Sequence, residues 1–209
     1  MGNQLTFTGG GELDNGLTVG ISFVLDQGDN ETENATGAGS SPFDSHSVSI
    51  SSDSLGTLTM HGEGGSSAQA AIDTTAAGDI WDTFDGTTTG TTVSSSTSGA
   101  DILVYALPAI VDGLSVSASY SPQEGAASSS TAYAATYTGV EGLSVSYGVG
   151  DAATGVATTE ADSTTMKASY AIGSFTVAYS NNDYQTAVAD TDQETTSYKL
   201  SYTVSDAIS

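Results

Sequence analysis

The stretch that decides the fold reads Glu141-Gly142-Leu143-Ser144-Val145-Ser146-Tyr147-Gly148-Val149. Its apolar and aromatic side chains occupy every second position and alternate with serine and glycine. This is the period of a β-strand with two unlike faces. The Glu-Gly pair in front of it is typical of a tight turn, because glycine adopts the positive φ that short hairpins need. We therefore predict a strand over 142–150 that follows a hairpin turn.

The same turn and strand recur along the whole chain. Near copies begin at Asn15-Gly16-Leu17 and Asp112-Gly113-Leu114, and looser ones at Leu55-Gly56 and Ile172-Gly173. The pattern predicts about eleven strands, at 4–12, 16–25, 46–52, 56–62, 101–107, 113–121, 131–138, 142–150, 163–171, 174–181 and 195–204. Longer polar stretches, rich in Gly, Ser, Thr and Ala, lie at 26–45, 63–100, 122–130, 150–162 and 182–194.

Tight turns and long loops therefore alternate. This is typical of an all-β, antiparallel up-and-down barrel that crosses a membrane with its strands. The polar face is small and uncharged, as suits a barrel lumen. Tyrosines cluster toward strand ends, as in an interfacial aromatic girdle, at Tyr105, Tyr120, Tyr133, Tyr137, Tyr147, Tyr170, Tyr179, Tyr198 and Tyr202. In a soluble β-sandwich, the alternative, these tyrosines would be core residues.

The composition excludes several classes of function. Twenty-five Asp and Glu face two Lys and no Arg, which gives a net charge of −23. Such a chain is not expected to bind nucleic acid, because nothing could neutralise the phosphates. The absence of Cys excludes disulfides and thiolate nucleophiles. No G-x-S-x-G, H-E-x-x-H or P-loop motif occurs, so we predict no enzyme and no required cofactor.

Five segments together carry a resemblance to a known family: 11–20, 55–60, 78–82, 103–105 and 113–120. In their order and spacing the chain resembles the general porins of alphaproteobacteria, especially those of marine species. The resemblance implies a homotrimer of sixteen-stranded barrels in the bacterial outer membrane, in contact with lipid and lipopolysaccharide. It also implies passive transport of small hydrophilic solutes through the pore.

The resemblance further implies how the chain is organised. The third outer loop of such porins folds into the barrel and narrows it, and the long stretch 63–100 is in the matching place. Residues 1–209 would then be a single but partial barrel domain, without the first strand and the last four. The signal peptide and the C-terminal aromatic strand of the family are not recognised either, so we expect an incomplete chain.

Strand parity predicts the side chains that line the pore. Lys167, Lys199 and His61 share the small face with serine and threonine, while the pore-narrowing loop carries Glu63, Asp73, Asp79, Asp82 and Asp85. By resemblance, acidic groups on this loop face a basic wall. Because the wall here holds few basic residues, the field is net negative and we predict a preference for cations. The alternative is that these carboxylates are merely solvated loop residues.

A calcium site is a further expectation. An Ala-rich stretch over 68–77 could form a short helix, and Asp79, Asp82 and Asp85 are spaced at i, i+3 and i+6. On a helical turn these carboxylates would share a face and offer the hard oxygens that Ca²⁺ prefers.

Two other functions remain open on the sequence. An acidic secreted or surface-layer adhesin, built as a β-sandwich or β-solenoid with or without a dependence on calcium, fits the composition equally well, but it would stay soluble without detergent. A sugar-specific channel would carry aromatic side chains inside the lumen, whereas the strand parity points the aromatics outward, so we rank it lower.

Overall fold

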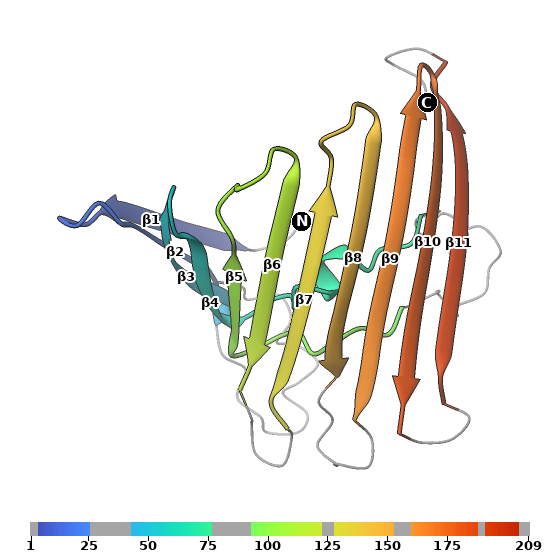
Figure 1. Ribbon diagram of the computed structural model, residues 1–209. Coiled ribbons are helices and arrows are strands. Elements are labelled where there is room, and N and C mark those ends of the chain that lie inside the picture. The colour runs from blue at the N-terminus through green and yellow to red at the C-terminus, as the bar shows by residue number, and fades with distance from the viewer. Residues whose placement is uncertain are drawn as a thin grey trace.

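The computed structural model describes residues 4–25, 43–76, 93–122, 128–152, 160–187 and 191–204. They form eleven strands in one antiparallel sheet, in which each strand pairs with its neighbours in the sequence (Figure 1). The strands are β1 Leu5–Glu12, β2 Thr18–Leu25, β3 Phe43–Ser52, β4 Gly56–Glu63, β5 Ile102–Ala106, β6 Leu114–Ser121, β7 Ser130–Tyr137, β8 Leu143–Ala152, β9 Ala161–Ile172, β10 Phe175–Thr186 and β11 Gln193–Tyr202. The predicted strand number and up-and-down order are confirmed.

The predicted hairpin turn before β8 is also present. Gly142 has a φ of +76°, and a Cβ atom there would lie 2.4 Å from the carbonyl oxygen of Ala171. This position therefore requires glycine for its conformation and for its space.

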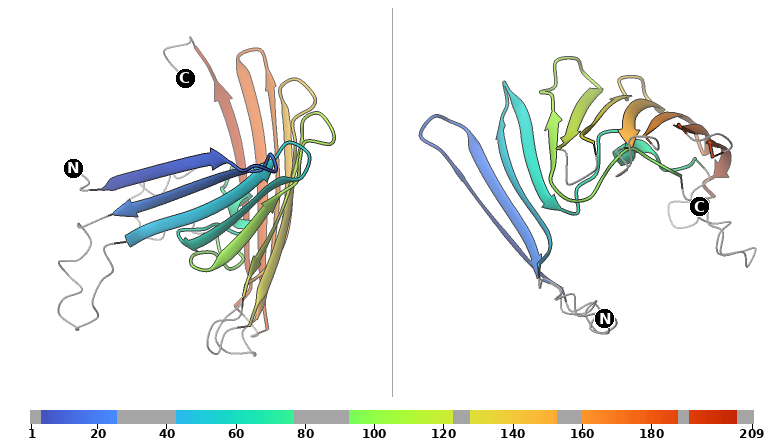
Figure 2. Two further views of the ribbon diagram at one scale, coloured as in Figure 1. Left: turned by 90° about the vertical axis from the view of Figure 1, so that its left-hand side faces the viewer. Right: turned by 90° about the horizontal axis from the view of Figure 1, so that it is seen from below.

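The sheet curves into an open trough, and β1 and β11 are its edge strands in the described part of the chain (Figure 2). The connection between β4 and β5 turns back along the concave face. The described part of this connection contains one short 3₁₀ helix, η3 Ala70–Ile72, within the stretch 68–77 where the sequence suggests a short helix. Among the described residues, no helix has the length and apolar character needed to span a membrane.

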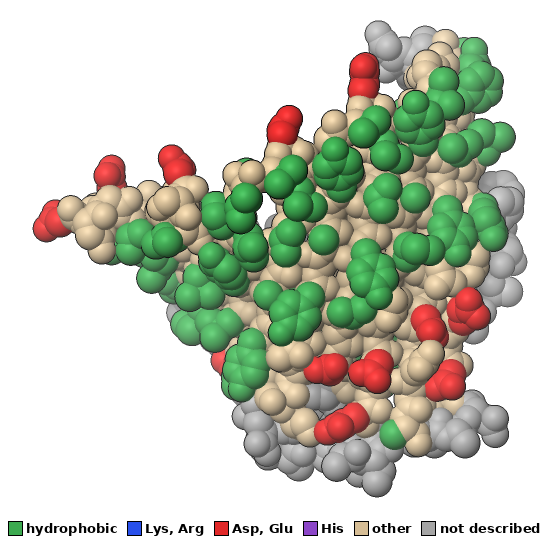
Figure 3. Space-filling model, viewed as in Figure 1, with side chains coloured by type: hydrophobic (Ala, Val, Ile, Leu, Met, Phe, Trp, Pro, Cys, Tyr) green, Lys and Arg blue, Asp and Glu red, His purple; other side chains and the backbone are tan. Residues whose placement is uncertain are grey.

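The two faces of the sheet differ in side-chain size and polarity. Large apolar and aromatic side chains on the convex face are exposed, and Figure 3 shows them as a band with carboxylates at both borders. Most of the side chains that are buried on the concave face are small, such as Ala132, Ser146, Ser163 and Thr165, and Ile102 beside Gly65 is a larger exception. An apolar exterior around a polar, small-residue interior is typical of a sheet that faces lipid.

Two glycines of β8 let the concave face accept a second layer of chain. A Cβ atom at Gly148 would lie 2.9 Å from Ile72 Cδ1 and 3.3 Å from Gln69 Cα, and one at Gly150 would lie 2.8 Å from Ser96 Cβ. Glycine in a strand interior commonly marks a place where another backbone comes close. The β4–β5 connection therefore packs directly on the sheet.

Candidate functional site

The candidate site is the contact between the concave face and the chain that lies on it. We call residues 64–76 and 93–101 the inner segment, with 64–76 as its first limb and 93–101 as its second (Figure 2). The two limbs are joined where Gly65 and Gly99 exchange two backbone hydrogen bonds, each of 2.8 Å. The inner segment is thus one folded unit rather than two separate strands of chain.

Gln69 is at the centre of the contact, and its side chain is fully buried. Its Oε1 accepts hydrogen bonds from the amide nitrogen of Ser96 at 2.8 Å and from Ser96 Oγ at 2.9 Å. Its Nε2 donates to Thr165 Oγ1 at 2.7 Å, and that hydroxyl donates to Asn182 Oδ1 at 2.6 Å. One side-chain amide therefore joins the first limb to the second limb and, through Thr165, to β9 and β10.

Backbone amides of the inner segment also bond to side chains of the sheet. Ala68 N donates to Ser119 Oγ on β6, and Ala76 N donates to Ser180 Oγ on β10, both at 2.9 Å. These residues of the segment belong to no strand that would pair their N–H groups, and a buried unpaired N–H is costly. The hydroxyl-rich concave face supplies the missing acceptors, which explains why serine and threonine suit it.

The structure brings together two of the charged residues predicted from the sequence. Lys167 on β9 donates from Nζ to Thr74 Oγ1 at 2.5 Å. Asp73 lies close enough to attract this ammonium group electrostatically, and its carboxylate accepts a hydrogen bond from the Ser95 hydroxyl. A lysine of the wall thus faces a carboxylate of the inner segment across the concave face.

The structure places the other described site residues elsewhere. His61 lies on β4, and its Cβ would be 2.8 Å from a Cβ at Gly65, so it borders the first limb. Lys199 lies on β11, exposed, and pairs with Ala178. Both residues stay predictions as members of a pore constriction.

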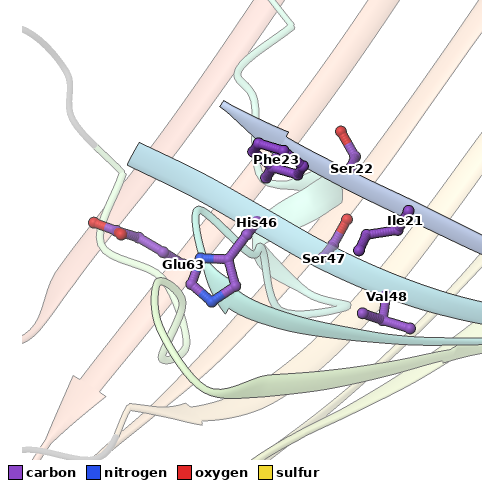
Figure 4. A pocket seen from close by; sticks show the side chains of 7 residues that line it. All are labelled: Ile21, Ser22, Phe23, His46, Ser47, Val48 and Glu63. Atoms are coloured by element: carbon purple, nitrogen blue, oxygen red, sulfur yellow. The ribbon is translucent and has the colours of Figure 1, made fainter. Parts of the chain in front are cut away.

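Glu63 lies beside the outer end of β3. A β-bulge near Gly62 makes Glu63 pair with His46. His46 alternates with Val48 along β3, and Val48 is exposed on the convex face, so the bulge places Glu63 on the convex side as well. These residues line a pocket of about 420 Å³ together with Ile21, Ser22, Phe23 and Ser47 (Figure 4). The register therefore separates Glu63 from Asp73 and Lys167, and its place in a constriction also stays a prediction.

The proposed calcium ligands Asp79, Asp82 and Asp85 lie outside the described residues, so their role stays a prediction. Within the described ranges, no group of three or more His, Asp or Glu side chains is arranged to hold a metal ion.

Sequence reasoning missed Gln69, Ser96 and Asn182. A signal for Gln69 was present, since it is the one long polar side chain in the run Ser66-Ser67-Ala68-Gln69-Ala70-Ala71. A single amide among small residues can reach a partner that its neighbours cannot. Nothing in the sequence indicated the partners, which lie 27 and 96 residues away from Gln69.

Comparisons with solved structures find similar folds in substituted variants of the porin from Rhodopseudomonas blastica. One variant has 12% sequence identity and a TM-score of 0.49, covering 97% of this chain and 80% of its own. A second variant has 13% identity and a TM-score of 0.46 with the same coverage. A third has 15% identity and a TM-score of 0.46, covering 94% of this chain and 78% of its own. No curated protein matches the sequence.

The comparison with protein families gives a match over the entire sequence. The model for the Gram-negative porin family matches residues 1–209. Porins are outer-membrane channels rather than enzymes, which supports the channel prediction and not the adhesin alternative. Because the match spans residues 1–209, this chain belongs to the Gram-negative porin family of the bacterial outer membrane.

Proposed function

We propose that this porin is a general diffusion channel that passes small hydrophilic solutes passively and prefers cations. The observation that carries the proposal is the charge balance, since 25 carboxylates face two lysines in the sequence. A water-filled pore with negative walls concentrates cations and repels anions. In this proposal no residue makes or breaks a bond.

The concave face has the chemistry of an unselective lumen. Strand alternation puts hydroxyl groups, glycine and alanine on it along β6 to β11, and these offer weak, exchangeable hydrogen bonds to hydrated solutes. Among the tyrosines, only Tyr184 falls on this face by alternation, while nine fall on the convex face. This distribution supports general diffusion over a sugar-specific channel, which would need a row of aromatic rings inside the pore.

The inner segment is proposed as the constriction. It lies on the concave face and fills part of the space that the curved sheet encloses (Figure 2). Asp73 and Lys167 would then face each other at the narrowest part of the pore and produce a local transverse field. Because one lysine cannot balance the carboxylates of the whole chain, the net effect on ions is a preference for cations.

The homotrimer is also part of the proposal, and the distribution of tyrosine supports it. All ten tyrosines lie at or after Tyr105, so strands β1 to β4 have none. Their convex face carries aliphatic side chains and Phe instead, including exposed Ile21, Val48 and Ile50. Surfaces at a membrane interface are enriched in tyrosine and tryptophan. We therefore assign the tyrosine-rich face of β5 to β11 to lipid and lipopolysaccharide, and the face of β1 to β4 to a second copy of the chain.

The test is conductance of the purified protein in a planar lipid bilayer under a KCl gradient. Steps that occur in groups of three, with a reversal potential on the K⁺ side of zero, are expected. Steps with a reversal potential on the Cl⁻ side would contradict the cation preference but would still support a channel. A protein that gives no steps and stays soluble without detergent would contradict the channel itself.

A further inference from the structure

We propose that Gln69 is the positioning residue that holds the inner segment against the wall and so sets the aperture of the channel. This inference rests on the proposed function, because an aperture matters only if solutes cross the concave side of the sheet. The inference explains how the inner segment is kept in place on the sheet, whereas the charge balance explains only the preference for cations. The hydrogen bonds of one buried amide carry it.

Gln69 is the point at which three separate parts of the chain meet. In the described contacts, other ties join one limb to the sheet or one limb to the other, as Ser67 Oγ does with Ser96 Oγ. The Gln69 amide does both, since it bonds to Ser96 on the second limb and to Thr165 on β9. Its partners are themselves buried, with exposed fractions of 4% for Ser96 and 0% for Thr165. Loss of the amide would leave the amide nitrogen of Ser96 on the second limb without its acceptor and Thr165 Oγ1 on β9 without its donor.

The tie is electrically neutral throughout. Gln69, Ser96, Thr165 and Asn182 carry no charge, and the backbone amides that bond to Ser119 and Ser180 carry none either. The nearby charged groups are Asp73 on the first limb and Lys167 on β9, and both lie outside this set of bonds. The Gln69 tie itself therefore does not respond to pH, whereas two other contacts of the inner segment, Lys167–Thr74 and Asp73–Ser95, involve charged groups. A pore whose aperture depends on this neutral tie should keep its size limit for neutral solutes when a change of pH alters its ion selectivity.

Exchange of Gln69 for glutamic acid tests this directly. In the variant Gln69→Glu, the protonated carboxyl group has an O–H that donates to Thr165 Oγ1 and a carbonyl oxygen that accepts from Ser96, so it reproduces the glutamine. The ionised carboxylate can only accept, and it puts a charge in a fully buried place. This variant should therefore hold the segment at acidic pH and release it as pH rises. The midpoint should lie above the ordinary glutamate pKa of about 4.3, since burial disfavours the charged form.

The readouts are open-channel current noise and the size limit for neutral polyethylene glycols, each measured from acidic to neutral pH in planar bilayers. Release is expected to raise the undocked population roughly tenfold, because an unpaired buried polar group shifts an equilibrium by about that factor. All other ionisable groups are the same in the wild type, so comparison with the wild type at each pH removes their effect. Gln69→Leu should be noisy at every pH.

Thr136→Val is the matched control for Gln69→Leu. Thr136 bonds to Ser146 on the sheet at 2.8 Å, so its loss removes a bond between two sheet hydroxyls that the inner segment does not share. Wild-type noise in Thr136→Val with a pH-dependent Gln69→Glu supports the proposal. Channels in which Gln69→Glu stays as quiet as the wild type at all pH values overturn it and leave the proposed function intact. A wild type that gives no channels overturns both.

Discussion

At the scale of single residues, Lys167 is the cation that the structure places beside a carboxylate of the inner segment. Its Nζ bonds to Thr74, and Asp73 attracts it. Replacement by glutamine removes a positive charge where the pore is proposed to be narrowest. Lys167→Gln should therefore move the reversal potential further toward K⁺, as measured in a KCl gradient.

Lys199→Gln is the control for this substitution. It removes the same charge from an exposed position on β11, which the described contacts do not link to the inner segment. Its shift in reversal potential should be smaller than that of Lys167→Gln. Equal shifts would mean that the total charge of the channel, and not its placement at the constriction, controls selectivity.

Residue-level prediction from the sequence succeeded where strand alternation is unbroken. Alternation puts Lys167 on the concave face, and its bond to Thr74 of the inner segment agrees. Alternation could not place Glu63, because an extra residue near Gly62 shifts the pairing of β4 with β3 and so moves Glu63 to the other face of the sheet. It could not find the partners of Gln69 either, because that contact depends on how the inner segment folds and not on a local period.

At the scale of the elements, β8 and the inner segment fit because Gly148 has no side chain. A Cβ atom there would lie 2.9 Å from Ile72 Cδ1 and 3.3 Å from Gln69 Cα. Gly148→Val should push the first limb off the wall and cost about 1–3 kcal/mol, as overpacking does elsewhere. The midpoint of heat unfolding in detergent should fall, and open-channel noise in bilayers should rise.

Gly11→Val is the control at a second strand glycine. Nothing lies within 4 Å of a Cβ atom built at Gly11, on β1. This variant should therefore give wild-type open-channel noise. Noise is the readout compared, because Gly11 shares the convex face of β1 to β4 that is assigned to the subunit contact. Equal effects of the two substitutions would show that valine disturbs the strands themselves and that packing against the inner segment does not matter.

The strands were predictable as elements, but their ends were not. All eleven were found from the two-residue period, yet β10 continues to Thr186 rather than 181 and β3 begins at Phe43 rather than 46. The end of β10 reads Asn-Asp-Tyr-Gln-Thr over 182–186 and is polar on both faces. The ladder with β9 continues there, from Thr186 to Ala161, without any change of polarity to reveal it.

At the scale of the whole molecule, the carboxylates should control ion preference without controlling pore size. Protonation in acid removes negative charge from a chain with a net charge of −23. The reversal potential in a KCl gradient should therefore move toward zero as pH falls, while the size limit for neutral polyethylene glycols stays constant. A size limit that changes in parallel with the reversal potential would mean that charged groups also hold the inner segment.

Assembly of the whole molecule depends on which face meets protein and which meets lipid. Ile50 on β3 and Val177 on β10 are matched convex positions, 43% and 48% exposed, and they lie respectively on the face without tyrosine and on the face with it. Ile50→Asp should convert trimers to monomers, as measured by native mass spectrometry in detergent, because an interface between subunits would bury the unpaired charge.

Val177→Asp should leave the trimer intact in detergent and reduce insertion into lipid instead, since a charge on a lipid-facing strand is costly in the membrane. The opposite pattern, with trimers lost in Val177→Asp and kept in Ile50→Asp, would move the subunit contact to the tyrosine-rich face. The distribution of tyrosine would then describe the protein contact rather than the lipid boundary, and the face of β1 to β4 would have to be the one in contact with lipid.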